Sequence, residues 1–153
     1  MANIVIVQYK QRLDHLFDQV KAFTDNTELQ AQWARYLCIL VAGFIEISIQ
    51  EILGKYTKDK AAPNVTNYVY SRLKRFTNPN MEDILVLLGS FEAGWRRNTE
   101  IVAEGKLKDA VDSVMALRNP IAHGVDTGIS YIRIKEYYQS VLKLVEHIET
   151  TCV

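Results

Sequence analysis

Apolar residues recur every three or four positions along most of this chain, which is the period of an amphipathic α-helix. In the first stretch they stand at Ile6, Tyr9, Leu13, Leu16, Val20 and Phe23. This spacing places them on one helical face. The pattern predicts an amphipathic first helix, and the polar run Thr24-Asp25-Asn26-Thr27 offers cap residues for the helix that follows.

The second stretch predicts a long helix over about residues 28–56. Its apolar positions are Leu29, Trp33, Leu37, Leu40, Phe44 and Ile47. Between Leu37 and Ile47 nearly every face is apolar, which is typical of the central helix of a bundle. We expect Gly54 and the lysine-rich residues 55–60 to end it. The longest apolar run, Tyr36 to Ile45, is closed by Glu46 and is too short to span a bilayer, so we expect no membrane association.

The remaining stretches continue the helical period. They predict a shorter helix over about 65–76, one or two helices over 81–104, a helix from about 106 into the segment 117–124, and a last helix through Ile134, Tyr138 and Ile148. Gly89-Ser90 and Gly94 are possible breaks in the second of these regions. Residues 131–134 fit one turn of strand or the entry to a helix, and we favour the helix. The prediction is an all-α fold, a single bundle of five to seven helices over residues 1–153.

Composition narrows the function classes. The chain has 18 basic and 18 acidic residues, so its formal net charge is zero. That balance argues against a protein that coats nucleic acid by bulk charge, but it leaves room for a local basic groove. Of the two cysteines, Cys38 lies in an apolar run and is expected to be a small core residue. The N-terminus lacks the pattern of a signal peptide, so we expect a cytoplasmic protein.

The segment Leu117 to Gly124 departs from the regular pattern. Pro120 is expected to interrupt the helix, because it lacks an N–H group and clashes with the preceding turn. Gly124 is a natural helix stop. Arg118 and His123 would lie roughly 140° apart around an unbroken helix, and a kink at Pro120 would bring them closer. A helix C-terminus alone also explains an arginine and a histidine here, since both favour the negative end of the helix dipole.

The same residues resemble a known motif. Arg118 and Asn119, then Pro120-Ile121-Ala122, then His123 and Gly124, at the end of the penultimate predicted helix, resemble the Arg-polar-x-x-x-His motif of the HEPN superfamily. The arrangement is similar to the RiboL-PSP-HEPN branch, with its long apolar helix that contains an internal Glu, here Glu46. The resemblance covers nearly the whole chain and implies a HEPN-like helical bundle.

The resemblance implies a metal-independent endoribonuclease, a hydrolase that serves as a toxin in a toxin–antitoxin system or in antiviral defence. It implies a homodimer whose two motifs share one cleft, an RNA substrate, a possible antitoxin protein as partner, and no cofactor. His123 would act as acid or base, because imidazole titrates near neutrality. Arg118 would stabilise the charge of the phosphate in the transition state, and Asn119 would orient a reacting group.

Two other interpretations remain open at this point. One is a non-catalytic HEPN module that serves dimerisation or RNA binding, or that partners a nucleotidyltransferase. The other is an unrelated helical scaffold whose Arg118 segment is only a helix end. Glu46, which has apolar neighbours and so needs a cation or donor, is expected to approach Arg118 or His123 as a fourth site residue.

Other chemically interesting residues carry weaker expectations. No Cys and His residues have the spacing of a metal site. We expect His15 and His147 to be solvated on helix faces, and Trp33 and Trp95 to be packing anchors. Two basic clusters would either guide an RNA backbone or be ordinary solvated faces; they consist of Arg72, Lys74, Arg75, Arg96 and Arg97.

Overall fold

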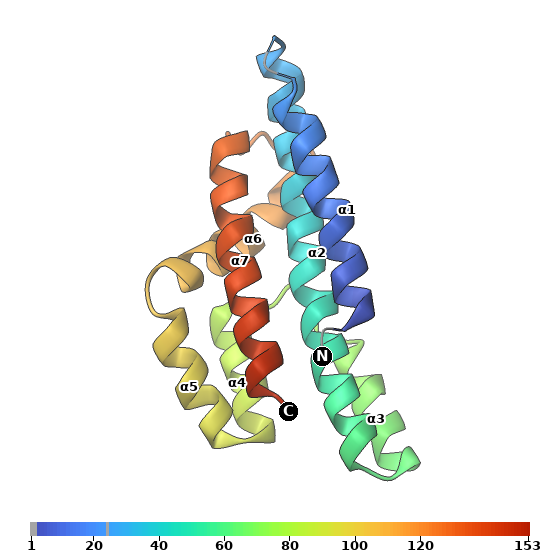
Figure 1. Cartoon of the computed structure of the whole chain (residues 1–153). Helices are drawn as coiled ribbons and strands as arrows, with labels where there is room; N and C mark the ends of the chain where they lie inside the picture. The colour runs from blue at the N-terminus through green and yellow to red at the C-terminus, as the bar shows by residue number, and fades with distance from the viewer. Residues whose placement is uncertain (1–2, 24) are drawn as a thin grey trace.

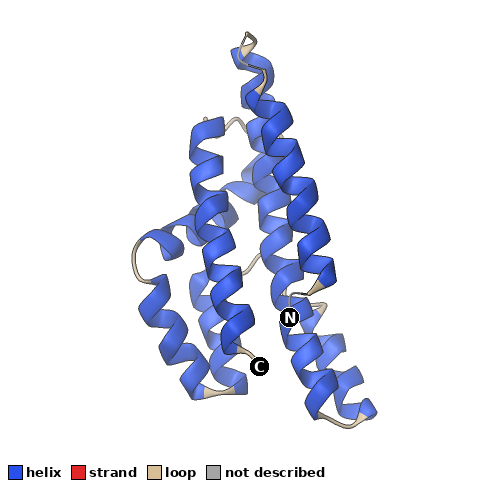
Figure 2. Cartoon of the chain, viewed as in Figure 1, coloured by secondary structure: helices blue, strands red, loops and turns tan. Residues whose placement is uncertain are grey.

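A computed structural model describes residues 3–23 and 25–153, and it shows that this part of the chain is all helical, with no strand (Figure 2). The all-α prediction is confirmed, with seven helices in the described residues. They are α1 (Ile4–Lys21), α2 (Thr27–Lys60), α3 (Pro63–Leu73), α4 (Met81–Phe91), α5 (Ala93–Ala103), α6 (Lys106–Ala122) and α7 (Tyr131–Thr151).

Side-chain caps begin most of these helices. The Asn3 side chain accepts hydrogen bonds from the first turn of α1, and Asn26 accepts one from the Leu29 N–H at 2.9 Å. Asn80 and Asp83 form a reciprocal capping box at the start of α4. The predicted cap run 24–27 is therefore confirmed in Asn26, while Thr24 lies outside the described residues.

The long helix α2 is the core of the bundle. It packs against α1, α3, α6 and α7, and Figure 1 shows α1 lying along its upper half. By length and composition alone α2 is apolar enough to cross a membrane, which the short apolar run in the sequence did not indicate. Buried residues make up 61% of its most apolar window. The apolar surface of α2 is thus largely covered by the other helices.

Helix α2 ends at Lys60, within the predicted lysine-rich stretch 55–60, but Gly54 does not end it, contrary to the prediction. A Cβ atom at position 54 would lie only 2.6 Å from a ring carbon of Tyr70 in α3. Gly54 is therefore a point of close contact between α2 and α3, where only a residue without a side chain fits. The break between α4 and α5 likewise falls at Glu92, whose extended backbone separates the helices, and not at Gly89 or Gly94.

The motif helix α6 packs against α2. The Cys38 thiol, buried as predicted, donates to the Val114 carbonyl at 3.8 Å, and Arg35 pairs with Asp126 at 3.2 Å. Moving toward the N-terminus of α2 therefore means moving toward the end of α6. The Arg118 segment lies at the same end of the bundle as the first turns of α2 and the start of α7.

Candidate functional site at the end of helix α6

The helix α6 continues through Pro120 to Ala122, so the predicted interruption at Pro120 is wrong. Pro120 stands in the last turn, where few helical bonds remain to be lost. Its missing N–H deprives only the Ala116 carbonyl of the usual helical donor. Because Ala116 is exposed, its carbonyl is accessible to water.

The end of α6 is closed by a Schellman motif. Gly124 has a φ of +81°, a conformation that L side chains rarely adopt. Its N–H donates to the Ile121 carbonyl at 3.0 Å, and the Val125 N–H donates to the Pro120 carbonyl at 2.9 Å. This double closure holds the exposed His123 at the C-cap position, where the backbone cannot easily fray.

Asn119 connects the other two motif residues. The Arg118 Nη1 group donates to the Asn119 Oδ1 atom at 3.2 Å, and the His123 N–H donates to the Asn119 carbonyl at 3.0 Å. No hydrogen bond joins the side chains of Arg118 and His123 in the described structure. The two residues share one helix end: the Asn119 side chain contacts the Arg118 guanidinium, and the Asn119 carbonyl accepts the ordinary helical bond from the His123 backbone.

The guanidinium of Arg118 has no carboxylate within 4.0 Å among residues 3–23 and 25–153. Arg118 is partly buried, and most of its five N–H donors stay available for an anion. The loop behind the motif is held by Arg35, whose pairing with Asp126 sequence reasoning missed. Ninety-one positions separate the two residues, and nothing local in the sequence signals the pair.

Glu46 does not contact Arg118 or His123 within this chain, which corrects the expectation for that residue. Its carboxylate accepts a hydrogen bond from the Asn78 backbone N–H, in the loop before α4. The half-buried acid does find a donor, as its apolar neighbours require. The donor is backbone from another loop, so Glu46 stabilises the α3–α4 connection.

The register of the two helices explains this outcome. Glu46 lies eight residues beyond Cys38 in α2, or about 12 Å along the axis, and Arg118 lies four residues beyond Val114 in α6, or about 6 Å in the opposite direction. Because Cys38 contacts Val114, these two displacements lead away from each other, toward different ends of the bundle. A catalytic role for Glu46 has no support from this contact.

The two other histidines differ from each other. His15 is exposed, as predicted. His147 is half-buried, so its predicted solvation is wrong: its Nε2 atom lies 3.2 Å from the hydroxyl oxygen of the buried Thr99 and 3.3 Å from that of Thr151. Burial lowers the pKa of His147. It acts as a polar contact between α5 and α7, and α7 periodicity alone could not show that α5 covers it.

The two basic clusters differ in whether their side chains pair with carboxylates. Arg96 pairs with Glu82 and with Glu100, each at 2.8 Å. In the described residues, no carboxylate lies within 4.0 Å of Arg72, Lys74 or Arg75. The same holds for the exposed Arg97, so positive charge without a carboxylate partner is left at the end of α3, just beyond it, and at Arg97. Of the predicted packing anchors, Trp95 is buried and Trp33 is half-buried.

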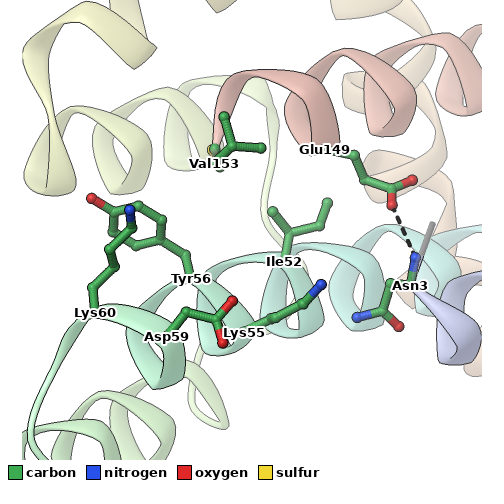
Figure 3. A pocket seen from close by; sticks show the side chains of 9 residues that line it. Asn3, Ile52, Lys55, Tyr56, Asp59, Lys60, Glu149 and Val153 are labelled. Carbon is green, nitrogen blue, oxygen red and sulfur yellow. Dashed lines mark hydrogen bonds between the residues drawn. The ribbon is translucent and has the colours of Figure 1, made fainter. Parts of the chain in front are cut away.

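A cavity of about 290 Å³ lies between α2 and α7 near the C-terminus (Figure 3). Ile52, Tyr56, Lys60 and Glu149 are among its lining residues, and the Asn3 N–H donates to Glu149 across its edge at 3.4 Å. None of the motif residues lines it. His123 lies elsewhere, exposed on the surface of the bundle.

Comparison with known proteins supports the resemblance seen in the sequence. Neither a search of curated proteins nor a search of solved structures found a match. The model of one protein family, RiboL-PSP-HEPN, matches residues 6–153. That span contains Arg118, Asn119 and His123 and covers all but the first five positions, so an unrelated helical scaffold is excluded. The chain belongs to the RiboL-PSP-HEPN family.

Proposed function

We propose that this protein is a metal-independent endoribonuclease of HEPN type, which cleaves RNA at a site shared by two copies of the chain. The observation that carries the proposal is the end of α6. There an arginine without a carboxylate partner, hydrogen-bonded to the Asn119 side chain, and an exposed histidine share a helix end closed by a Schellman motif. A structural helix terminus has no need of this combination.

The proposed reaction uses the 2′-hydroxyl of the RNA as nucleophile. A base removes the proton of that hydroxyl, its oxygen bonds to the adjacent phosphorus, and the bond from phosphorus to the 5′-oxygen breaks. An acid returns a proton to the leaving 5′-oxygen. The products are a 2′,3′-cyclic phosphate and a 5′-hydroxyl. Arg118 would neutralise the added charge of the pentacovalent phosphate, and Asn119 would hold its guanidinium in place.

A homodimer would complete this site. His123 is the histidine of the motif in each chain, so a two-fold pair supplies two imidazoles, one as base and one as acid. Val125, next to Gly124 and 53% exposed, is an exposed apolar residue directly at the end of the motif. We propose that the surface around Val125 forms the two-fold contact that brings the motifs together.

The test is cleavage of RNA by purified protein in the presence of EDTA, followed by analysis of the fragment ends. We expect cleavage to continue and to leave 2′,3′-cyclic phosphates, and we expect DNA of the same sequence to stay intact because it lacks the hydroxyl. The His123→Ala variant should lose roughly two or more orders of magnitude in rate if His123 is an acid or base. Abolition by EDTA, or full activity of His123→Ala, would overturn the mechanism.

We further propose that the enzyme acts in the cytoplasm as a toxin or defence effector, held inactive by an antitoxin protein. Brief expression of the wild-type chain should then stop growth and degrade RNA, whereas expression of His123→Ala should do neither. Absence of cleavage on every RNA tested, with a dimer still present, favours the second candidate, a non-catalytic HEPN module.

A further inference from the structure

A groove runs between α3 and α4, away from the Arg118 segment. Two adjoining hollows of about 300 and about 460 Å³ form it, and they share Arg75, Phe76 and Leu87 as lining residues. The Gln50 side chain donates to the Phe76 carbonyl at 3.3 Å and fixes the groove to α2. Gln50 lies twelve residues beyond Cys38, so the groove is about 18 Å along α2 from the level of Val114.

Positive charge predominates in the segment that forms the α3 side of the groove. Residues 61–81 include Arg72, Lys74 and Arg75 and contain no Asp or Glu, in a chain whose net charge is zero. All three basic side chains are exposed, and none has a carboxylate within ion-pairing distance in the described structure. Asp83, whose carboxylate accepts the Asn80 N–H at 3.0 Å, is the one acidic residue that lines the two hollows, against the basic residues Arg72 and Arg75. The net positive charge of the lining is complementary to a polyanion.

Aromatic rings alternate with these cations. Tyr68 is 59% exposed, and the Arg72 guanidinium lies over its ring, 5.4 Å from the centroid, with Nε donating to the phenol oxygen at 3.1 Å. Phe76 and Phe91 line the same groove and are half-buried. A basic groove with aromatic side chains is the arrangement that binds single-stranded nucleic acid, because phosphates meet the cations and unstacked bases lie on the rings.

We infer that the α3–α4 groove binds single-stranded RNA and holds the substrate for the Arg118 site, an inference that rests on the proposed nuclease function. A duplex is excluded because its bases are paired inside and cannot reach the rings. The apolar groove floor, formed by Val69, Leu73 and Leu87, accepts the face of a base as the rings do. Arg72 and Arg75 contribute affinity and take no part in bond cleavage.

The test uses a fluorescein-labelled twelve-nucleotide oligouridine with 2′-O-methyl groups, which cannot be cleaved because the attacking hydroxyl is blocked. Fluorescence anisotropy over a salt series measures its affinity. The Arg72→Ala/Arg75→Ala variant should bind roughly tenfold more weakly, and the slope of log affinity against log salt should fall by about 1.4, or about 0.7 for each lost phosphate contact. On cleavable RNA, the same variant should raise KM and leave kcat unchanged.

The matched control is Lys10→Ala/Arg96→Ala. It removes the same two positive charges, but both residues already pair with carboxylates, so the affinity should remain close to that of the wild type. Tyr68→Ala should weaken binding severalfold by removing a stacking surface, while Tyr68→Phe should bind like the wild type. Equal losses in the control and in the Arg72→Ala/Arg75→Ala variant would show only a general charge effect and overturn the inference.

The two proposals fail in different ways. Oligouridine binding that depends on Arg72 and Arg75, without cleavage of any RNA, would refute the nuclease activity but support RNA binding in the groove. If the Arg72→Ala/Arg75→Ala variant cleaves RNA with wild-type affinity and KM, RNA binding in the groove is refuted and the nuclease activity is supported. No measurable binding by the wild type, or displacement of the oligonucleotide by polyglutamate as efficiently as by unlabelled oligouridine, would also overturn the groove.

Discussion

Arg96 in α5 and Arg118 in α6 are both partly exposed arginines on amphipathic helices, yet their surroundings differ. Arg96 donates from Nη2 to Glu82 and from Nε to Glu100, and these hydrogen bonds raise the pKa of its guanidinium. Arg118 donates to the neutral amide of Asn119. One arginine is already neutralised by two carboxylates, and the other keeps its charge for an external anion.

The comparison shows that the number of basic residues says little about anion binding. Glu82 belongs to the first turn of α4 and reaches Arg96 because α4 and α5 pack side by side. The helix end that contains Arg118 meets no acidic side chain in the described residues. What matters for function is which basic residues the fold leaves unpaired, and the same criterion distinguishes Arg72 and Arg75 from Arg96.

The largest expected effect comes from replacing Arg118 with alanine, and Arg96→Ala is the matched control. Arg118→Ala should reduce RNA cleavage by roughly two orders of magnitude, because a charge that stabilises the transition state is lost. Arg96→Ala should leave the rate essentially unchanged, since its charge is already paired. Single-turnover rates on one RNA measure both, with circular dichroism as the control for folding. Equal effects of the two substitutions would show that the difference in ion pairing between Arg118 and Arg96 has no bearing on cleavage.

The next effect concerns the exposed Val125 at the end of the motif. Val125→Asp should convert the dimer to a monomer, because the two-fold axis would bring like charges together in an apolar contact. Cleavage should then fall by an order of magnitude or more, since each monomer has one motif histidine. Analytical ultracentrifugation measures whether the protein is a dimer or a monomer. Ile101→Asp, on the exposed face of α5, is the control and should remain dimeric. A fully active monomer would refute the shared site.

A smaller effect is expected at the turn behind His123. Gly124→Ala forces a Cβ into a left-handed conformation and should destabilise the fold by about 1–2 kcal/mol. Cleavage should also fall, because the C-cap that positions His123 is disturbed. Thermal unfolding and cleavage rates measure the two quantities. Gly94→Ala is the control, since Gly94 has an ordinary helical backbone. Unchanged activity in a destabilised Gly124→Ala variant would show that His123 needs no fixed cap.

Glu46→Ala tests whether Glu46 is structural or catalytic. Loss of its bond to the Asn78 N–H should lower stability by roughly 1 kcal/mol, because a partly buried donor loses its acceptor. The cleavage rate of the folded protein should change by no more than about twofold, as for residues outside a site. Rates are measured well below the unfolding temperature. A hundredfold loss of rate with unchanged stability would return Glu46 to the catalytic set.

The smallest effect is a pH dependence at His147. Burial lowers its pKa in the folded state, so the unfolded chain binds the proton more readily. Stability should therefore be complete above about pH 6.5, the ordinary value for histidine, and decline as the pH falls below it. Thermal unfolding at several pH values measures this. His147→Gln should flatten the decline, whereas replacing the exposed His15 should not.

Much of the fold was predictable from local pattern. The three-to-four-residue period placed most of the helices, and the polar run 24–27 marked the start of α2 through the cap residue Asn26. The predictions failed where a residue had two possible uses. Gly54 suggested a break and serves close packing against Tyr70, and Pro120 suggested a kink and fits in a last turn.

The sequence by itself determined the helical class, the position of Arg118, Asn119 and His123 at a helix end, and the resemblance to HEPN proteins. These depend on neighbours within one or two helical turns. The tertiary structure alone decided that Glu46 bonds to Asn78, that His147 is covered by Thr99, and that Arg96 is paired while Arg118 is free. Each of these outcomes requires side chains from separate helices or loops, and burial and charge pairing depend on distance in space, which a linear pattern does not contain.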